Sequence, residues 1–287
     1  MKSFFRSLRW PLVAFVIYLV MQVVCSVAAA CLKIVNHDIR TGTIVALGLL
    51  LSSVVTSIVL LRMKKFELKD AFRSFGCTRQ MTLVAFVAVL AGLFGSNLIN
   101  EFLDLPNPFE KLFTEMSGSI WGMLAIGVLG PICEEIVFRG GIMKPMLKRG
   151  INPWAAILTS AVIFGLIHGN PAQIFFATLV GIMFGIVYYR TGSLVITTIC
   201  HVVNNSMAVV VMNLLDEESK NQTTADMIGT PGAYALLAVF VTLCVMLLRN
   251  FWQKTEATKF VWQEPQEVQP ELMAEAQQPT EQTAAES

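Results

Sequence analysis

Charged residues are scarce in this sequence. They account for 14% of its 287 residues, whereas hydrophobic residues account for 55%. Soluble domains contain about 25% charged residues, so this composition excludes an ordinary soluble protein and indicates a membrane protein. The formal net charge is only +1, and it gives no indication of a nucleic-acid partner.

Disulfide and metal-binding patterns are also missing. The six cysteines have no Cys-x-x-Cys spacing, and most of them fall inside apolar runs. Such cysteines are typically small buried hydrophobic residues rather than members of disulfides or metal clusters. The zinc-protease motif His-Glu-x-x-His is absent as well.

Long apolar runs, in contrast, occur along most of the chain. A membrane-spanning helix needs roughly 20 apolar residues, and this rule predicts an all-α, polytopic membrane protein with about eight transmembrane helices. The predicted spans are residues 11–31, 43–61, 81–99, 119–138, 153–168, 171–189, 193–214 and 233–248. Residues 28–30 could end a signal peptide, but the first run is long for a signal-peptide core, so an uncleaved helix is predicted.

The basic residues predict the orientation of these spans. They are concentrated near the N-terminus, in the loop between the second and third spans, and in later loops on the same side. By the positive-inside rule both termini are cytoplasmic, and we expect an integral protein of a bacterial inner membrane. Residues 62–76 mix basic residues with phenylalanine and leucine, so they form either an amphipathic helix on the membrane surface or an ordinary loop.

Two adjacent carboxylates lie within the fourth predicted span. Glu134 and Glu135 are the only charged residues between positions 119 and 138, and a charge at bilayer depth is costly and usually functional. Arg139 lies four residues after Glu135, so the two share a helix face and suit an ion pair. Glu134 points about 100° away from Glu135 and has no partner on its own helix. In a dry cavity such a carboxylate suits a proton-handling base.

Two of the three histidines also lie in predicted spans. His168 follows Phe164 by one helical turn, and His201 shares a helix face with Asn205. Taken singly, each is more typical of hydrogen bonding between helices than of catalysis. Together with Glu134, however, three helices could direct these side chains into one cavity. Glu134 and His168 could then deprotonate a water, while His201 and Asn205 stabilise the oxygen that becomes negative when the water attacks a carbonyl.

These elements resemble the CPBP family of intramembrane proteases, also described as type II CAAX prenyl endopeptidase-like or Abi proteins. The three motifs of that family stand in order and inside spans. In this sequence they are Glu134-Glu135-Ile-Val-Phe-Arg139, Phe164-Gly-Leu-Ile-His168 and His201-Val-Val-Asn-Asn205. The resemblance covers about residues 119–210, and each motif is weak alone but strong in combination.

The resemblance implies an eight-helix fold, a polar cavity that opens within the membrane, and endopeptidase activity on a membrane-associated protein or peptide. The residues it assigns to catalysis are Glu134, His168, His201 and Asn205, and those it assigns to support of the site are Glu135, Arg139 and Phe164. Eukaryotic members remove the last three residues of prenylated CAAX proteins. Whether prenylated proteins are substrates of this chain stays open.

Metal dependence also stays open at this point. One glutamate and two histidines could bind zinc, and the candidate ligands would be Glu134, His168 and His201. A water activated directly by glutamate needs no metal, however, and the favoured mechanism therefore requires no cofactor.

Two other functions are compatible with the same residues. Intramembrane Glu, Arg and His suit an ion- or proton-coupled transporter, whose broken helices could lie at Gly130-Pro131 and at residues 169–171. A non-enzymatic membrane partner, such as a bacteriocin-immunity protein, is the third hypothesis.

The chain divides into three predicted parts. Residues 1–118 contain the first three helices, residues 119–249 form the catalytic transmembrane core, and residues 250–287 form a disordered acidic tail in the cytoplasm. The last 25 positions, residues 263–287, contain several glutamates and no Lys or Arg. Such a composition cannot bury enough apolar surface to fold.

Overall fold

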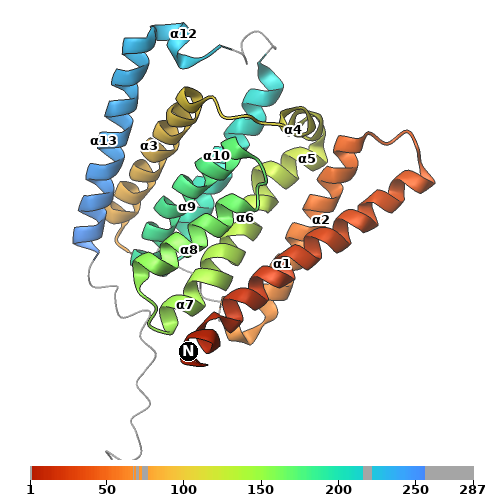
Figure 1. Cartoon of the computed structure of the whole chain (residues 1–287), viewed down its shortest axis with the longest axis horizontal. Helices are drawn as coiled ribbons and strands as arrows, with labels where there is room; N and C mark the ends of the chain where they lie inside the picture. The colour runs from red at the N-terminus through yellow and green to blue at the C-terminus, as the bar shows by residue number, and fades with distance from the viewer. Residues whose placement is uncertain (1, 67, 69–70, 73–76, 216–221, 256–287) are drawn as a thin grey trace, which may run out of the picture.

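The computed structural model describes residues 2–66, 68, 71–72, 77–215 and 222–255, with side chains from Leu8 onward (Figure 1). The regular secondary structure of these residues is helical. The longer elements are α1 (Lys2–Val35), α2 (Thr41–Arg62), α3 (Arg79–Leu103), α8 (Pro153–Leu166), α9 (Pro171–Thr191), α10 (Val195–Leu214) and α13 (Thr230–Lys254). Short helices are η1 (Lys64–Phe66), α4 (Glu110–Ser117) and α12 (Thr224–Ile228).

A continuous but irregular helix runs between positions 120 and 148. It consists of α5 (Ile120–Leu124), η3 (Ala125–Leu129), α6 (Gly130–Glu135), η4 (Ile136–Met143) and α7 (Lys144–Lys148). The segments η3 and η4 are π-helical. This broken helix lies between the α1–α2 pair on one side and α8 and α10 on the other (Figure 1).

The predicted class, an all-α polytopic membrane protein, is confirmed. Seven of the described helices are long and apolar enough to cross a membrane. The remaining predicted span, residues 153–168, corresponds to α8, which has only 14 residues. At 1.5 Å per residue α8 is about 21 Å long, less than the roughly 30 Å of the hydrocarbon core. A helix of this length that begins at one membrane surface ends inside the hydrocarbon core. The turn that follows α8, which contains His168, is therefore expected at the depth of the bilayer.

The helices α8 and α9 pack closely because glycines line their contact. A Cβ at Gly165 would lie 2.1 Å from Oγ1 of Thr178, and one at Gly185 would lie 2.9 Å from Ile157. A Cβ at Gly181 would lie 3.3 Å from the ring of Phe164. Small residues allow helix backbones to approach in membranes, where packing rather than the hydrophobic effect drives association. The close approach brings the Gly181 carbonyl and the Phe164 ring into one region.

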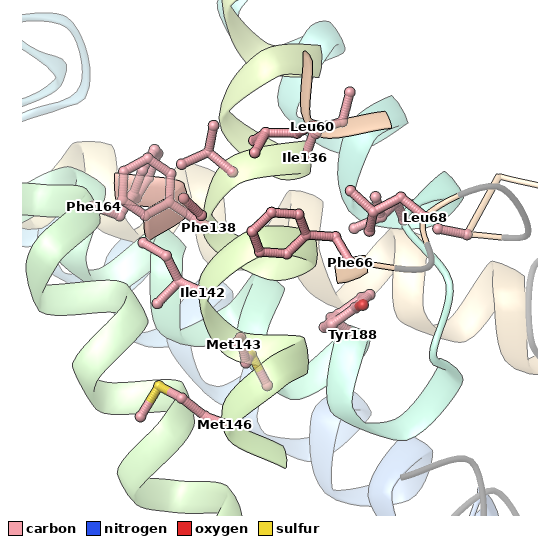
Figure 2. Packing of buried hydrophobic residues seen from close by; sticks show 14 of the residues in the cluster. Leu60, Phe66, Leu68, Ile136, Phe138, Ile142, Met143, Met146, Phe164 and Tyr188 are labelled. Atoms are coloured by element: carbon pink, nitrogen blue, oxygen red, sulfur yellow. The ribbon is translucent and has the colours of Figure 1, made fainter. Parts of the chain in front are cut away.

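The apolar core beside that region includes the beginning of the basic loop (Figure 2). Phe66 and Leu68 are buried among Leu60, Ile136 and Ile142. Two apolar side chains of residues 62–76 thus face the interior of the protein, which is not the arrangement of an amphipathic helix lying on the membrane surface. Residues 67, 69–70 and 73–76 of this segment lie outside the described residues.

The C-terminal helix extends beyond the predicted end of the last span. α13 continues to Lys254 and buries Phe251, so the first positions of the predicted tail are helical. Residues 256–287, which make up most of that tail, lie outside the described residues.

Candidate active site

The glutamate pair sits at the end of α6, between the two π-helical segments. Pro131 stands in the first turn of α6, which follows η3 without a gap, so its missing N–H leaves the backbone hydrogen bonds of this continuous helix incomplete. π-Helical turns are rare and often accompany functional sites. The local sequence therefore places Glu134 and Glu135 on the most irregular part of a membrane-spanning helix.

The predicted pair between Glu135 and Arg139 is present and buried. Nη1 of Arg139 donates to Oε1 of Glu135 at 2.9 Å, and the two side chains are 1% and 0% exposed, respectively. Nη2 of Arg139 donates to the carbonyl of Gly181 at 3.2 Å. The guanidinium also lies 4.8 Å from the centroid of the Phe164 ring and 5.2 Å from that of Phe184. These contacts offset the cost of burying two charges.

His201 contacts both glutamates through opposite nitrogens of its ring. Its Nδ1 lies 3.1 Å from Oε1 of Glu135, and its Nε2 lies 3.5 Å from Oε2 of Glu134. Because an ionised carboxylate only accepts hydrogen bonds, Nδ1 carries a hydrogen and Nε2 faces Glu134. The two acids diverge, as helix geometry predicts, and a single imidazole spans the gap between them.

The His168 ring is held in place by a hydrogen bond to the last turn of α8. Its Nδ1 lies 2.8 Å from the carbonyl oxygen of Phe164, and a carbonyl can only accept, so Nδ1 carries the hydrogen and Nε2 has a free lone pair. The Phe164 ring makes edge contacts with both imidazoles, at 5.1 Å to His168 and 5.7 Å to His201. The two histidines thus contact one buried ring. The structure pairs Glu134 with His201 rather than with His168.

Asn205 faces the backbone of η3. Its Nδ2 donates to the carbonyl of Ile126 at 3.1 Å, and its Oδ1 accepts from Nδ2 of Asn204 at 3.0 Å. These two contacts together define which way the amide points. One of the two Nδ2 hydrogens is therefore used on a carbonyl of the broken helix, on the same face of α10 as His201.

Three residues of the site or its surroundings belong to no motif in the sequence. Phe184 lies 5.3 Å from the His201 ring, Gly181 supplies a carbonyl to Arg139, and the buried Tyr18 of α1 packs with its ring centroid 5.9 Å from that of Phe138. All three lie in apolar runs without charged neighbours. The spacing of Gly181 and Gly185 by four positions indicates helix packing but no role beside an arginine.

The candidate zinc ligands Glu134, His168 and His201 do not form a metal site in the described residues. Within the described part of the chain, no group of three or more His, Cys, Asp or Glu side chains is placed to hold a metal ion. Glu134 and His201 are in contact, but His168 turns its Nδ1 to the carbonyl of Phe164 in α8. The mechanism below therefore includes no step through a metal.

The three motifs and their contacts fall within one segment that resembles known proteins. Residues 116–207 match the family model described as type II CAAX prenyl endopeptidase Rce1-like. About a third of the chain is thus similar to this family. The match confirms the resemblance inferred from the motifs, and every candidate site residue in them lies within the matched segment.

One relative extends this comparison. The chain is similar to the protein named "Putative membrane peptidase YdiL" from Bacillus subtilis (strain 168), with 30% identity over 102 residues. The similar region is 34% of this chain and 41% of that protein, so the chain spans about two fifths of the length of the relative. No solved structure matches the chain.

Proposed function

We propose that this protein is an intramembrane endopeptidase of the CPBP type, which hydrolyses a peptide bond in a membrane-associated protein or peptide. The observation that carries the proposal is the placement of His201 between Glu135 and Glu134, with His168 and His201 both against the ring of Phe164. The similarity to the Rce1-like family and to the named relative supports a membrane peptidase. The catalytic core would be residues 119–249.

Charge balance supports this assignment of roles. Two carboxylates and one guanidinium leave one negative charge, and a single proton shared between His201 and Glu134 makes the four side chains neutral together. Neutrality reduces the cost of burial at membrane depth. The 3.5 Å separation of Nε2 and Oε2 is longer than an ordinary hydrogen bond, so a proton on Nε2 is not committed to Glu134.

The proposed reaction uses these groups in sequence. Glu134, whose side chain is 16% exposed, accepts a proton from a water, with His168 Nε2 as a second acceptor near that water. The water oxygen forms a bond to the carbonyl carbon of the substrate. The oxygen that becomes negative is stabilised by Nε2–H of His201 and by the second N–H of Asn205. Glu134 then delivers its proton to the leaving nitrogen as the C–N bond breaks.

The location of the reaction follows from the same proposal. We place the protein in a bacterial inner membrane with both termini in the cytoplasm, because the basic loops favour that orientation. The bilayer then excludes bulk water from the site and strengthens the electrostatic contacts within it. Prenylated and unprenylated substrates are distinguished by the experiment below.

The test is a survey of protein termini in membrane fractions. Cells expressing the wild-type chain should contain new termini that are absent with Glu134→Ala and with His168→Ala. Glu110→Ala, which changes an exposed glutamate of α4, is the matched control and should keep them. Mass spectrometry of the released fragments identifies a prenyl group where there is one. Identical termini in the wild-type chain and Glu134→Ala, at equal expression, would overturn the proposal.

A further inference from the structure

Pro131 interrupts the backbone hydrogen bonds of the broken helix at membrane depth. Proline has no N–H, so position 131 cannot donate to the carbonyl four residues earlier, at Gly127, or to the one five residues earlier, at Ile126. In a bilayer, backbone groups without partners cost several kcal/mol, and side chains of neighbouring helices commonly compensate for such breaks.

Two consecutive side chains of α10 donate to these two carbonyls. The hydroxyl of Ser206 donates to the carbonyl of Gly127 at 3.1 Å, and Nδ2 of Asn205 donates to that of Ile126 at 3.1 Å. The acceptors are the two carbonyls that Pro131 cannot serve. Consecutive residues of α10 thus donate to consecutive carbonyls of the broken helix, and α10 supplies the hydrogen-bond donors that the broken helix lacks.

The local glycines make this arrangement possible. A Cβ at Gly127 would lie 3.2 Å from the Ser206 hydroxyl and 3.5 Å from its Cα, so a larger residue would push α10 away. A Cβ at Gly130 would lie 2.6 Å from the carbonyl oxygen of Ala125, which accepts the Gly130 N–H across the π-helical turn. The π-helical turn and its contact with α10 therefore depend on both glycines.

We propose that Ser206 is a positioning residue of the site: with Asn205 it replaces the donor that Pro131 lacks, and so it sets the turn that directs Glu134 toward His201. The catalytic part of this inference rests on the proposed function. His201 and Ser206 lie on the same helix, only five positions apart. A shift of α10 against η3 would therefore change the separation of His201 and Glu134 directly.

The test compares Ser206→Ala, Ser206→Thr, Pro131→Ala and the double variant Ser206→Ala/Pro131→Ala in the purified full chain. Ser53→Ala is the matched control, because this buried hydroxyl donates at 2.8 Å to Leu49 within its own regular helix. The first readout is the side-chain ¹⁵N resonances of the histidines, which need no substrate. The second is the thermal unfolding midpoint, and the third is the yield of Glu134-dependent termini in cells.

Ser206→Ala should shift the Nε2 resonance of His201 and reduce the Glu134-dependent termini roughly tenfold or more. Ser206→Thr keeps the hydroxyl and should restore both, and Ser53→Ala should change neither. Pro131→Ala supplies a backbone donor, so adding Ser206→Ala to it should lower the unfolding midpoint less than Ser206→Ala does alone.

Two results would overturn the proposal. One is an unchanged His201 resonance in Ser206→Ala. The other is an equal loss of unfolding midpoint from Ser206→Ala with and without Pro131. A shifted resonance combined with termini that do not depend on Glu134 would support the positioning role and contradict the proteolytic function, so the two conclusions can fail separately.

Discussion

Oε1 of Glu135 accepts hydrogen bonds from both Arg139 and His201, at 2.9 and 3.1 Å. This single oxygen connects the broken helix to α10. It orients the imidazole so that the opposite nitrogen faces Glu134. The two adjacent acids therefore have different tasks: Glu135 organises the site, and the partly exposed Glu134 is available for proton transfer.

The first prediction concerns stability. Glu135→Gln removes the charge that compensates Arg139 in a fully buried pair, so the free energy of unfolding should fall by about 3–5 kcal/mol. Glu134→Gln is the control in the same helix, and it should cost much less because Glu134 has no bond to the guanidinium. Denaturation in detergent measures both. Equal losses for the two variants would contradict the assignment of Glu135 as the organising acid.

The second prediction concerns the tautomer of His168. Because Nδ1 donates to the carbonyl of Phe164, ¹⁵N spectra should show this ring protonated at Nδ1 and unprotonated at Nε2. His168→Asn places an amide donor near the position of Nδ1 and should keep the unfolding midpoint close to the wild-type value. His168→Gln should lower it. Both variants should reduce cleavage about 10²–10⁴-fold, the usual contribution of a general base.

Sequence reasoning found the parts of the site that depend on a single helix. The ion pair of Glu135 and Arg139 follows from their spacing of four, because such neighbours meet on any α-helical surface. The divergence of Glu134 from Glu135 has the same origin. The three motifs also predicted the similarity of residues 116–207 to the Rce1-like family, because they place polar residues at fixed spacings inside apolar spans.

The contacts between helices cannot be predicted from the sequence alone. The position of His201 between two acids depends on how α10 packs against α6, and no spacing rule encodes that. Asn205 was predicted as an oxyanion donor, but one of its hydrogens is donated to Ile126, because the proline break of a neighbouring helix needs a donor. The predicted membrane orientation and the disorder of residues 256–287 stay predictions.

The third prediction concerns the Phe164 ring, which contacts both histidines. Phe164→Leu keeps an apolar side chain but loses the ring contacts with Arg139, His168 and His201. We expect a loss of about 1–2 kcal/mol in unfolding free energy together with weaker cleavage. Phe109→Leu is the control, since that phenylalanine is 39% exposed just before α4. The importance of the buried ring would be refuted if both variants unfolded like the wild-type chain.

The fourth prediction concerns pH at the short helix α12. The carboxylate of Asp226 accepts hydrogen bonds from the backbone N–H and the hydroxyl of Thr223, at 2.9 and 2.7 Å, and these hold the pKa of Asp226 below its usual value. The cap is fully formed above the unfolded pKa of roughly 3.9 and is lost as the pH falls through the lower folded pKa. The Thr223 amide resonance should therefore titrate with a midpoint below that usual value. A midpoint at or above it would contradict the cap.

The fifth prediction concerns the far end of α13, where an arginine holds the helix against the core. Arg190 lies 4.5 Å from the centroid of the Trp252 ring and donates to Oγ1 of Thr255 at 3.0 Å and to the carbonyl of Trp252. Trp252 also stacks on Trp154 at 5.6 Å. These contacts join α13 to α8 and α9 at the end that precedes the acidic segment.

Trp252→Leu should release this end without unfolding the protein. We expect a loss of about 1–2 kcal/mol and faster tryptic cleavage after the exposed Lys254, because local opening governs access of the protease when opening is fast. Trp121→Leu, at a tryptophan that is 46% exposed on α5, is the matched control and should leave that cleavage rate unchanged. Equal tryptic rates in Trp252→Leu and the wild-type chain would show that the ring contacts of Trp252 contribute little to holding this end of α13.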